Sequence, residues 1–156
     1  MMWRLFLVLC VGSLVTFGTA RVSAAQTTSY DDNALRLEGH RGDTRIVRGV
    51  DGTVLGRIGV FHGVDVAKIV GPSKKATFEA KNFAANYGPG TWITAVGLAT
   101  LGAAVGVSRI HDVNRSIPTG LTVGGGALLI YGGGRLERAY NALSRSIWWY
   151  NRDLAR

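Results

Sequence analysis

The chain of 156 residues has one cysteine, three histidines and only 18% charged residues. The single cysteine, Cys10, excludes an internal disulfide and any metal site built from several thiolates. No two of the histidines, His40, His62 and His111, have the i, i+4 spacing that metal ligands on one helix need. We therefore expect no metal and no cofactor.

Catalytic groups are equally scarce. The carboxylates of Asp31, Asp32 and Asp51 lie before the first expected strand or in a turn, so nothing in the sequence pairs them as acid and base. The glycine clusters lack the lysine that completes a phosphate-binding P-loop. Since no set of nucleophile, base and oxyanion donor can be assembled, we expect a protein without catalytic activity.

The first 25 residues have the order of a secretory signal peptide. Arg4 precedes an apolar run from Leu5 to Phe17, and small residues follow up to Ala24 and Ala25. We expect cleavage after one of these alanines and export of the remaining chain. The alternative is an uncleaved membrane anchor, although the run is shorter than the ~20 residues that a spanning helix needs.

Residues 26–90 predict a small exported unit of strands and one helix. Residues Leu35 to Glu38 alternate apolar and polar, and the β-branched runs Thr44 to Arg48 and Thr53 to Ile58 meet across a turn that ends in Asp-Gly. Ser73 can cap a helix whose apolar stripe covers the sheet. We expect this helix to end at Gly88-Pro89-Gly90, because proline lacks the amide donor.

Residues 91–134 contain two stretches without a formal charge. Thr91 to Val107 has 17 uncharged residues and Ile117 to Gly134 has 18, with a polar connector between them. These stretches predict a hydrophobic helical hairpin. At 1.5 Å per residue each arm is about 25 Å long, a little short of the ~30 Å hydrocarbon core of a bilayer.

Small residues recur four positions apart in both stretches. In lipid this spacing lets helix backbones approach closely, whereas glycine weakens a helix in water by about 1 kcal/mol. The expected helix-packing residues are Ala95, Ala99, Gly102, Ala103, Gly106, Gly120 and Gly124. The pattern, confined to residues 91–134, resembles the glycine-zipper hairpins of exported bacterial membrane proteins. This resemblance implies packing in or on the membrane, with copies of the same chain or with a larger envelope protein.

Residues 135–156 predict a basic amphipathic helix. Three arginines, Arg138, Arg145 and Arg152, recur every seven residues beside an apolar stripe, and Trp148, Trp149 and Tyr150 are adjacent in sequence. Such a helix suits a membrane interface, where aromatic rings lie at headgroup level and arginine meets lipid phosphate. A helix that docks onto a soluble core, with solvated arginines, is the alternative.

Together these segments predict an α+β protein: a short β meander plus helix, then a Gly-rich helical hairpin and a C-terminal amphipathic helix. The function they favour is a non-catalytic, exported, membrane-associated protein of the bacterial envelope with a structural or interaction role. The alternative is a soluble periplasmic binding module with the hairpin as its core. The net charge of +8 favours anionic lipid as a partner, and export makes nucleic acid an unsuitable one.

The charge distribution conflicts with a simple membrane crossing. Lys74, Lys75 and Lys81 precede the hairpin and five arginines follow it, whereas the connector has only Arg109 and Arg115. The positive-inside preference would place the flanks in the cytoplasm, but a cleaved signal peptide places them outside. Three arrangements stay open: entry from outside without full crossing, burial in a protein assembly, or no membrane insertion.

Overall fold

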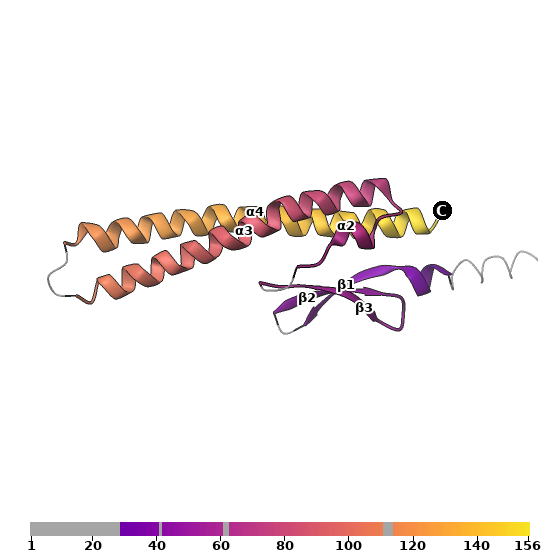
Figure 1. Ribbon diagram of the computed structural model, residues 1–156, viewed down its shortest axis with the longest axis horizontal. Helices are drawn as coiled ribbons and strands as arrows, with labels where there is room; N and C mark the ends of the chain where they lie inside the picture. Colours follow the sequence, from indigo (N-terminus) through magenta and orange to yellow (C-terminus); the bar gives the residue numbers. More distant parts are fainter. Residues whose placement is uncertain (1–28, 41, 61–62, 111–113) are drawn as a thin grey trace, which may run out of the picture.

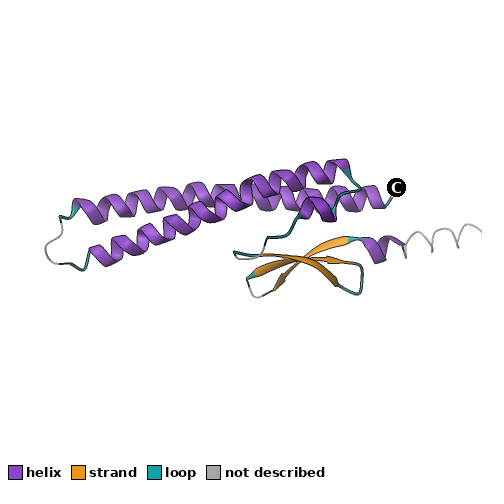
Figure 2. Cartoon of the chain, in the orientation of Figure 1, coloured by secondary structure: helices purple, strands orange, loops and turns teal. Residues whose placement is uncertain are grey.

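The computed structural model describes residues 29–156 except 41, 61–62 and 111–113, so the expected signal peptide lies outside the described residues. Residues 29–33 are helical. The elements that follow are β1 (Leu35–His40), β2 (Asp43–Arg48), β3 (Thr53–Ile58), α2 (Val66–Ile69), α3 (Lys74–Val107) and α4 (Ser116–Leu154) (Figure 2). The predicted α+β class, with a meander first and a long helical hairpin after it, is confirmed.

The three strands form one antiparallel sheet in the order β1-β2-β3. Leu35 pairs with Arg48 across the first ladder, and Thr44 pairs with Ile58 across the second. The turn between β2 and β3 needs glycine at Gly49, whose φ is 70°. A Cβ atom at Gly49 would also lie 2.6 Å from the carbonyl oxygen of Asp32. The turn between β2 and β3 is therefore packed closely against the helical residues 29–33.

The sheet packs against one half of the α3·α4 helix pair, with α2 beside it (Figure 1). The core is mainly apolar, with Ser73 and Ser146 as buried polar residues. Its largest fully buried side chains come from the strands, from Val70 at the end of α2 and from α4. Its members are Leu35, Ile46 and Ile58 of the sheet, Val66 and Val70 near α2, Ala76, Ala80 and Phe83 of α3, and Ala139, Ala142, Leu143 and Ile147 of α4. Burial of these side chains supplies the driving force that a three-stranded sheet lacks alone.

Helix α3 begins where Ser73 was expected to cap it, but it does not end at Pro89. The Ser73 side chain accepts a hydrogen bond from the Ala76 amide at 3.3 Å, which confirms the cap. Pro89 lies inside the helix, and the expected end at Gly88-Pro89-Gly90 is wrong. Pro89 and Ala85, one turn earlier, are both exposed, so water can reach the carbonyl group that loses its donor.

Helix α4 is likewise continuous across the boundary expected at residues 134 and 135. Gly132, Gly133 and Gly134 lie within the helix, and the hairpin arm and the basic segment are one rod. Contact with α3 supports the backbone there, since Gly132 is buried against Thr94. Tertiary packing thus overrides the low helix propensity of glycine.

Asn151 of α4 joins the helix to the edge of the sheet. Its side-chain amide donates to the Leu35 carbonyl at 2.8 Å, and its Oδ1 atom accepts from the Leu35 amide at 2.8 Å. The side chain thereby satisfies both backbone groups of an edge-strand residue, as a neighbouring strand would.

Replacing Asn151 with alanine should lower the free energy of unfolding by about 2 kcal/mol, because two partly buried backbone groups lose their partners. Chemical denaturation followed by circular dichroism measures the change. Asn141→Ala, at an exposed position of the same helix, is the matched control. Equal stability of the two variants would show that water replaces Asn151 at the sheet edge.

Candidate membrane-insertion surface

The helix pair continues beyond the sheet as a bare two-helix hairpin (Figure 1). Neither arm carries a charged residue between Lys81 and Arg109 or between Arg115 and Arg135. Its large apolar side chains point outward, and Trp92, Val123 and Ile130 are 74%, 68% and 80% exposed. Other exposed apolar side chains here are Val96, Leu98, Val105, Ile117 and Tyr131. Contiguous apolar surface of this kind marks a membrane or protein interaction site.

Among the described residues, α3 is the one helix long and apolar enough to cross a membrane by length and composition alone. Core helices of soluble proteins can meet the same test, but they are mostly buried. In α3, only 17% of the most apolar 18-residue stretch is buried. The glycine-rich α4 does not meet the same criterion of length and composition.

The two arms touch through glycines that leave no room for a side chain. A Cβ atom at Gly132 would lie 2.9 Å from the Thr94 amide nitrogen, and one at Gly125 would lie 3.0 Å from the Gly97 carbonyl oxygen. A Cβ atom at Gly90 would meet Leu136 at 3.2 Å. Because several of these neighbours are backbone atoms, they cannot move aside as a flexible side chain could. The arms therefore pack backbone to backbone.

The packing positions expected from four-residue spacing are not the ones used inside the hairpin. A Cβ atom at any of the expected glycines would meet nothing within 4 Å, and the expected alanines are exposed. The assignment of the contact between the arms to these residues is therefore wrong. The outward-facing residues are Ala95, Ala99, Gly102, Ala103, Gly106, Gly120 and Gly124.

The contact follows a repeat of seven residues. On α3, Ala76, Phe83, Gly90, Gly97 and Ala104 are buried at this spacing, and on α4 the buried series is Gly125, Gly132, Ala139 and Ser146. A strict seven-residue repeat keeps one seam facing the partner when two helices coil around each other with a left hand. The repeat is visible in the sequence, and searching at seven rather than four residues would have found it.

Aromatic and basic side chains mark the two ends of the bare hairpin. At the end beside the sheet, Trp92 is exposed, and the Arg135 guanidinium lies 5.9 Å from the Tyr131 ring centroid. The contact of Gly90 with Arg135 places these side chains at one level of the two arms. At the tip, Arg109 and Arg115 are exposed. Trp92 and Arg109 are 17 residues apart, which is about 25 Å of helix.

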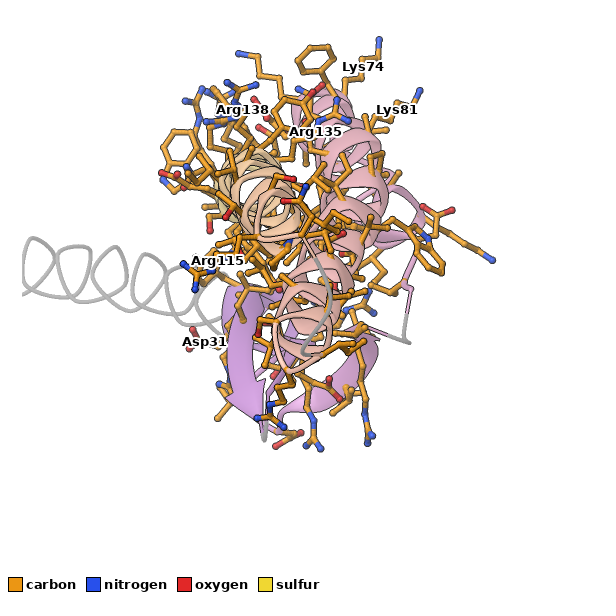
Figure 3. All side chains as sticks on the ribbon, turned by 90° about the vertical axis from the view of Figure 1, so that its left-hand side faces the viewer. Asp31, Lys74, Lys81, Arg115, Arg135 and Arg138 are labelled. Atoms are coloured by element: carbon orange, nitrogen blue, oxygen red, sulfur yellow. The ribbon has the colours of Figure 1, made fainter. Side chains whose placement is uncertain are left out.

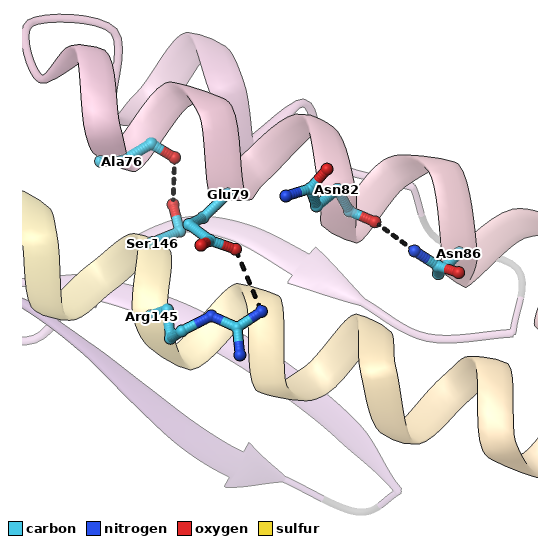
Figure 4. Close-up of polar contacts among 6 residues, drawn as sticks. All are labelled: Ala76, Glu79, Asn82, Asn86, Arg145 and Ser146. Atoms are coloured by element: carbon cyan, nitrogen blue, oxygen red, sulfur yellow. Dashed lines mark hydrogen bonds and ion pairs between the residues drawn. The ribbon is translucent and has the colours of Figure 1, made fainter.

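The C-terminal half of α4 docks onto the protein core. The Ser146 hydroxyl donates to the Ala76 carbonyl at 2.9 Å, and Arg145 pairs with Glu79 at 3.2 Å (Figure 4). Trp149 and Tyr150 pack against the core. This is the docking arrangement that the sequence left open as the alternative to a membrane interface.

The remaining predicted interface residues line the outer surface of the helix pair. Trp148 is exposed and contacts the Trp149 ring, and Arg152 lies 4.3 Å from the Trp149 centroid, as does the Nζ atom of Lys75. Lys74, Lys81 and Arg138 point to the side of the helices away from the sheet (Figure 3). These cations surround the half of the helix pair that packs against the sheet, not the uncharged half that extends beyond it.

The described residues contain no cluster of three or more histidine, cysteine, aspartate or glutamate side chains that could hold a metal ion. His62 and His111 lie outside the described residues. The chain matches no protein-family model, no curated protein and no solved structure.

Proposed function

We propose that this is a non-catalytic, exported protein of the cell envelope whose bare hairpin enters the membrane. The sheet and the base of the helix pair stay in water and serve a structural or interaction role. The observation that carries the proposal is the exposure of apolar side chains around an uncharged pair of helices, with Trp92, Tyr131 and Arg135 at one end. Such residues anchor a helix at the headgroup level.

The length of the hairpin supports shallow or complete insertion. The 25 Å between the aromatic level and the tip is a little less than the ~30 Å hydrocarbon core, and a thinned bilayer accommodates such a mismatch. The chain runs out along α3 and returns along α4, so both arms join the sheet unit at the same end of the hairpin. This end, at the level of Trp92 and Arg135, therefore lies on one side of the membrane. We propose that this is the extracytoplasmic side, with the tip arginines reaching toward the opposite headgroups.

Because α4 is one continuous helix, two modes of membrane binding exclude each other: insertion of the upright hairpin, and contact of the C-terminal arginines with the same membrane surface. Trp148 lies 17 residues beyond Tyr131, so it is about 25 Å from the proposed membrane boundary when the hairpin stands upright. Arg145 and Arg152 cannot then touch the same surface. We therefore propose that the C-terminal cations face water and that the apolar hairpin provides the membrane affinity.

A second copy of the chain or a helix of a larger envelope protein is the proposed protein partner. The outward-facing small residues of the hairpin, Gly102 and Gly106 among them, allow another helix to approach closely in lipid. The competing proposal is a soluble periplasmic binding module with the hairpin as its core. It requires a partner that covers the hairpin, since this chain leaves the hairpin exposed.

Flotation of the full chain with anionic or neutral vesicles, before and after carbonate extraction, tests the proposal. We expect the parent to stay with both kinds of vesicle after carbonate treatment, because apolar insertion does not need charge. A variant with Arg138, Arg145 and Arg152 changed to glutamine should float equally well. If this variant binds anionic vesicles a hundredfold more weakly than the parent, the C-terminal surface is the membrane site. If the parent itself is recovered in the soluble fraction, the result favours the soluble periplasmic module.

A further inference from the structure

A cavity of about 480 Å³ lies where the hairpin leaves the sheet. One wall is formed by Gly59, Val60 and Gly63, which follow β3 in sequence. The other is the face of α3 that contains Tyr87, Thr91, Trp92 and Ala95. A second cavity of about 220 Å³ shares Tyr87, Thr91 and Ala95 with the first and extends toward Tyr140. The two form adjoining parts of a groove along α3.

The groove is suited to an apolar ligand. Among the described residues, no charged side chain lines either cavity, and the Thr91 hydroxyl already donates to the Tyr87 carbonyl at 2.9 Å. The larger volume falls within the range of about 300–1,000 Å³ that is typical of ligand pockets. A ligand here would be held mainly by contact with aliphatic and aromatic surface.

The position of the groove indicates the source of that ligand. Trp92 lines the larger cavity and is also part of the aromatic level at the base of the bare hairpin. Ala95, one turn further along α3, lines both cavities and is part of the uncharged, outward-facing surface. The groove is thus continuous with the surface proposed to enter the bilayer, at the depth where acyl chains meet headgroups.

We infer that this groove binds one acyl chain of a membrane phospholipid, an inference that rests on the proposed insertion of the hairpin. The chain would lie along α3 between Trp92 and Ala95, beneath the wall that Val60 provides. Bound in this way, a single lipid would connect the sheet to the membrane without a charged contact.

The test counts the phospholipid that stays with the full chain after gentle detergent extraction from phospholipid membranes, using native mass spectrometry. Ala95→Leu and Ala95→Phe add bulk inside the groove. Ala99→Leu adds the same bulk one turn along the same exposed face, outside both cavities. We expect one retained phospholipid for the parent and for Ala99→Leu, and at least tenfold lower occupancy for both Ala95 variants.

Flotation of the same samples separates this inference from the proposed function. If the parent resists carbonate but retains no phospholipid, or if Ala95→Phe retains as much as Ala99→Leu, the lipid site is wrong and insertion stands. If the parent does not enter membranes at all, both the insertion and the lipid site are wrong.

Discussion

Replacing Gly132 with leucine should lower the melting temperature of the protein in detergent by about 6–12 °C. The new Cβ atom would lie 2.9 Å from the Thr94 amide nitrogen and 3.2 Å from the Gly90 carbonyl oxygen, so the two arms must separate. Overpacking of this severity costs about 3 kcal/mol, and each kcal/mol shifts the melting temperature of a protein of this size by about 2–4 °C. Gly97→Leu, which meets the Gly125 carbonyl oxygen at 3.1 Å, should behave in the same way.

Gly102→Leu and Gly124→Leu are matched controls with the opposite expected sign. A Cβ atom at either position meets nothing within 4 Å, and replacing a helical glycine removes a penalty of up to about 1 kcal/mol. Their melting temperatures should equal or exceed that of the parent, as measured by circular dichroism. If these controls melt early and Gly132→Leu does not, the arms pack through the four-residue stripes. If Gly102→Leu and Gly124→Leu change only the oligomeric state, the outward-facing small residues form the contact between two copies of the chain.

The difference between the two glycine series explains why sequence reasoning found the hairpin but not its seam. The absence of charged residues from two long stretches is a property of composition. It predicts a pair of apolar helices, whichever faces of the two helices are in contact. The seam depends on how two helices coil around each other. Gly97 and Gly125 belong to a seven-residue series that closes against the partner arm, whereas Gly102 and Gly124 lie outside it. Small residues on both sides of one helix made the four-residue stripe and the true seam hard to distinguish.

Local chemistry predicted the strands and the start of α3 but not where the helices end. The Asp51-Gly52 turn and the Ser73 cap depend on a few neighbouring residues, and both are present as expected. Pro89 was expected to stop α3 for an equally local reason. Its effect is overcome because the buried seam continues on both sides of it, at Phe83 and Gly90. Side-chain hydrogen bonds from Asn86 to the Asn82 carbonyl and from Thr91 to the Tyr87 carbonyl also flank the proline.

The C-terminal segment shows a different limit. Its arginine series and its aromatic run are compatible with a membrane surface and with a docked helix, because both need one apolar and one basic face. Docking is decided by residues far away in sequence. The Ala76 carbonyl accepts the hydrogen bond from Ser146, and the Leu35 amide and carbonyl exchange one hydrogen bond each with the Asn151 side chain. The partners are 70 and 116 residues apart in sequence, so no local pattern contains these contacts.

Introducing arginine at the middle of both arms should release the protein from the membrane. Ala99 and Val123 are exposed, and both lie near half the distance between the Trp92 level and the tip. An arginine at the centre of a spanning helix costs about 2.5–3.5 kcal/mol, so Ala99→Arg with Val123→Arg should lower the partition into vesicles by about four orders of magnitude. In water both positions are surface positions of a helix, where arginine is well tolerated, so the folded sheet unit should keep its circular dichroism spectrum.

The matched control places the same two charges on the same two helices beside the sheet. Ala85 and Ser144 are exposed there, and Ala85→Arg with Ser144→Arg should float with vesicles after carbonate treatment as the parent does. Release of the first pair with retention of the second locates the membrane contact on the bare hairpin, because fold, helix content and net charge are matched. Equal flotation of the two pairs would mean that the middle of the hairpin is not in hydrocarbon. Its exposed apolar side chains would then require a protein partner instead.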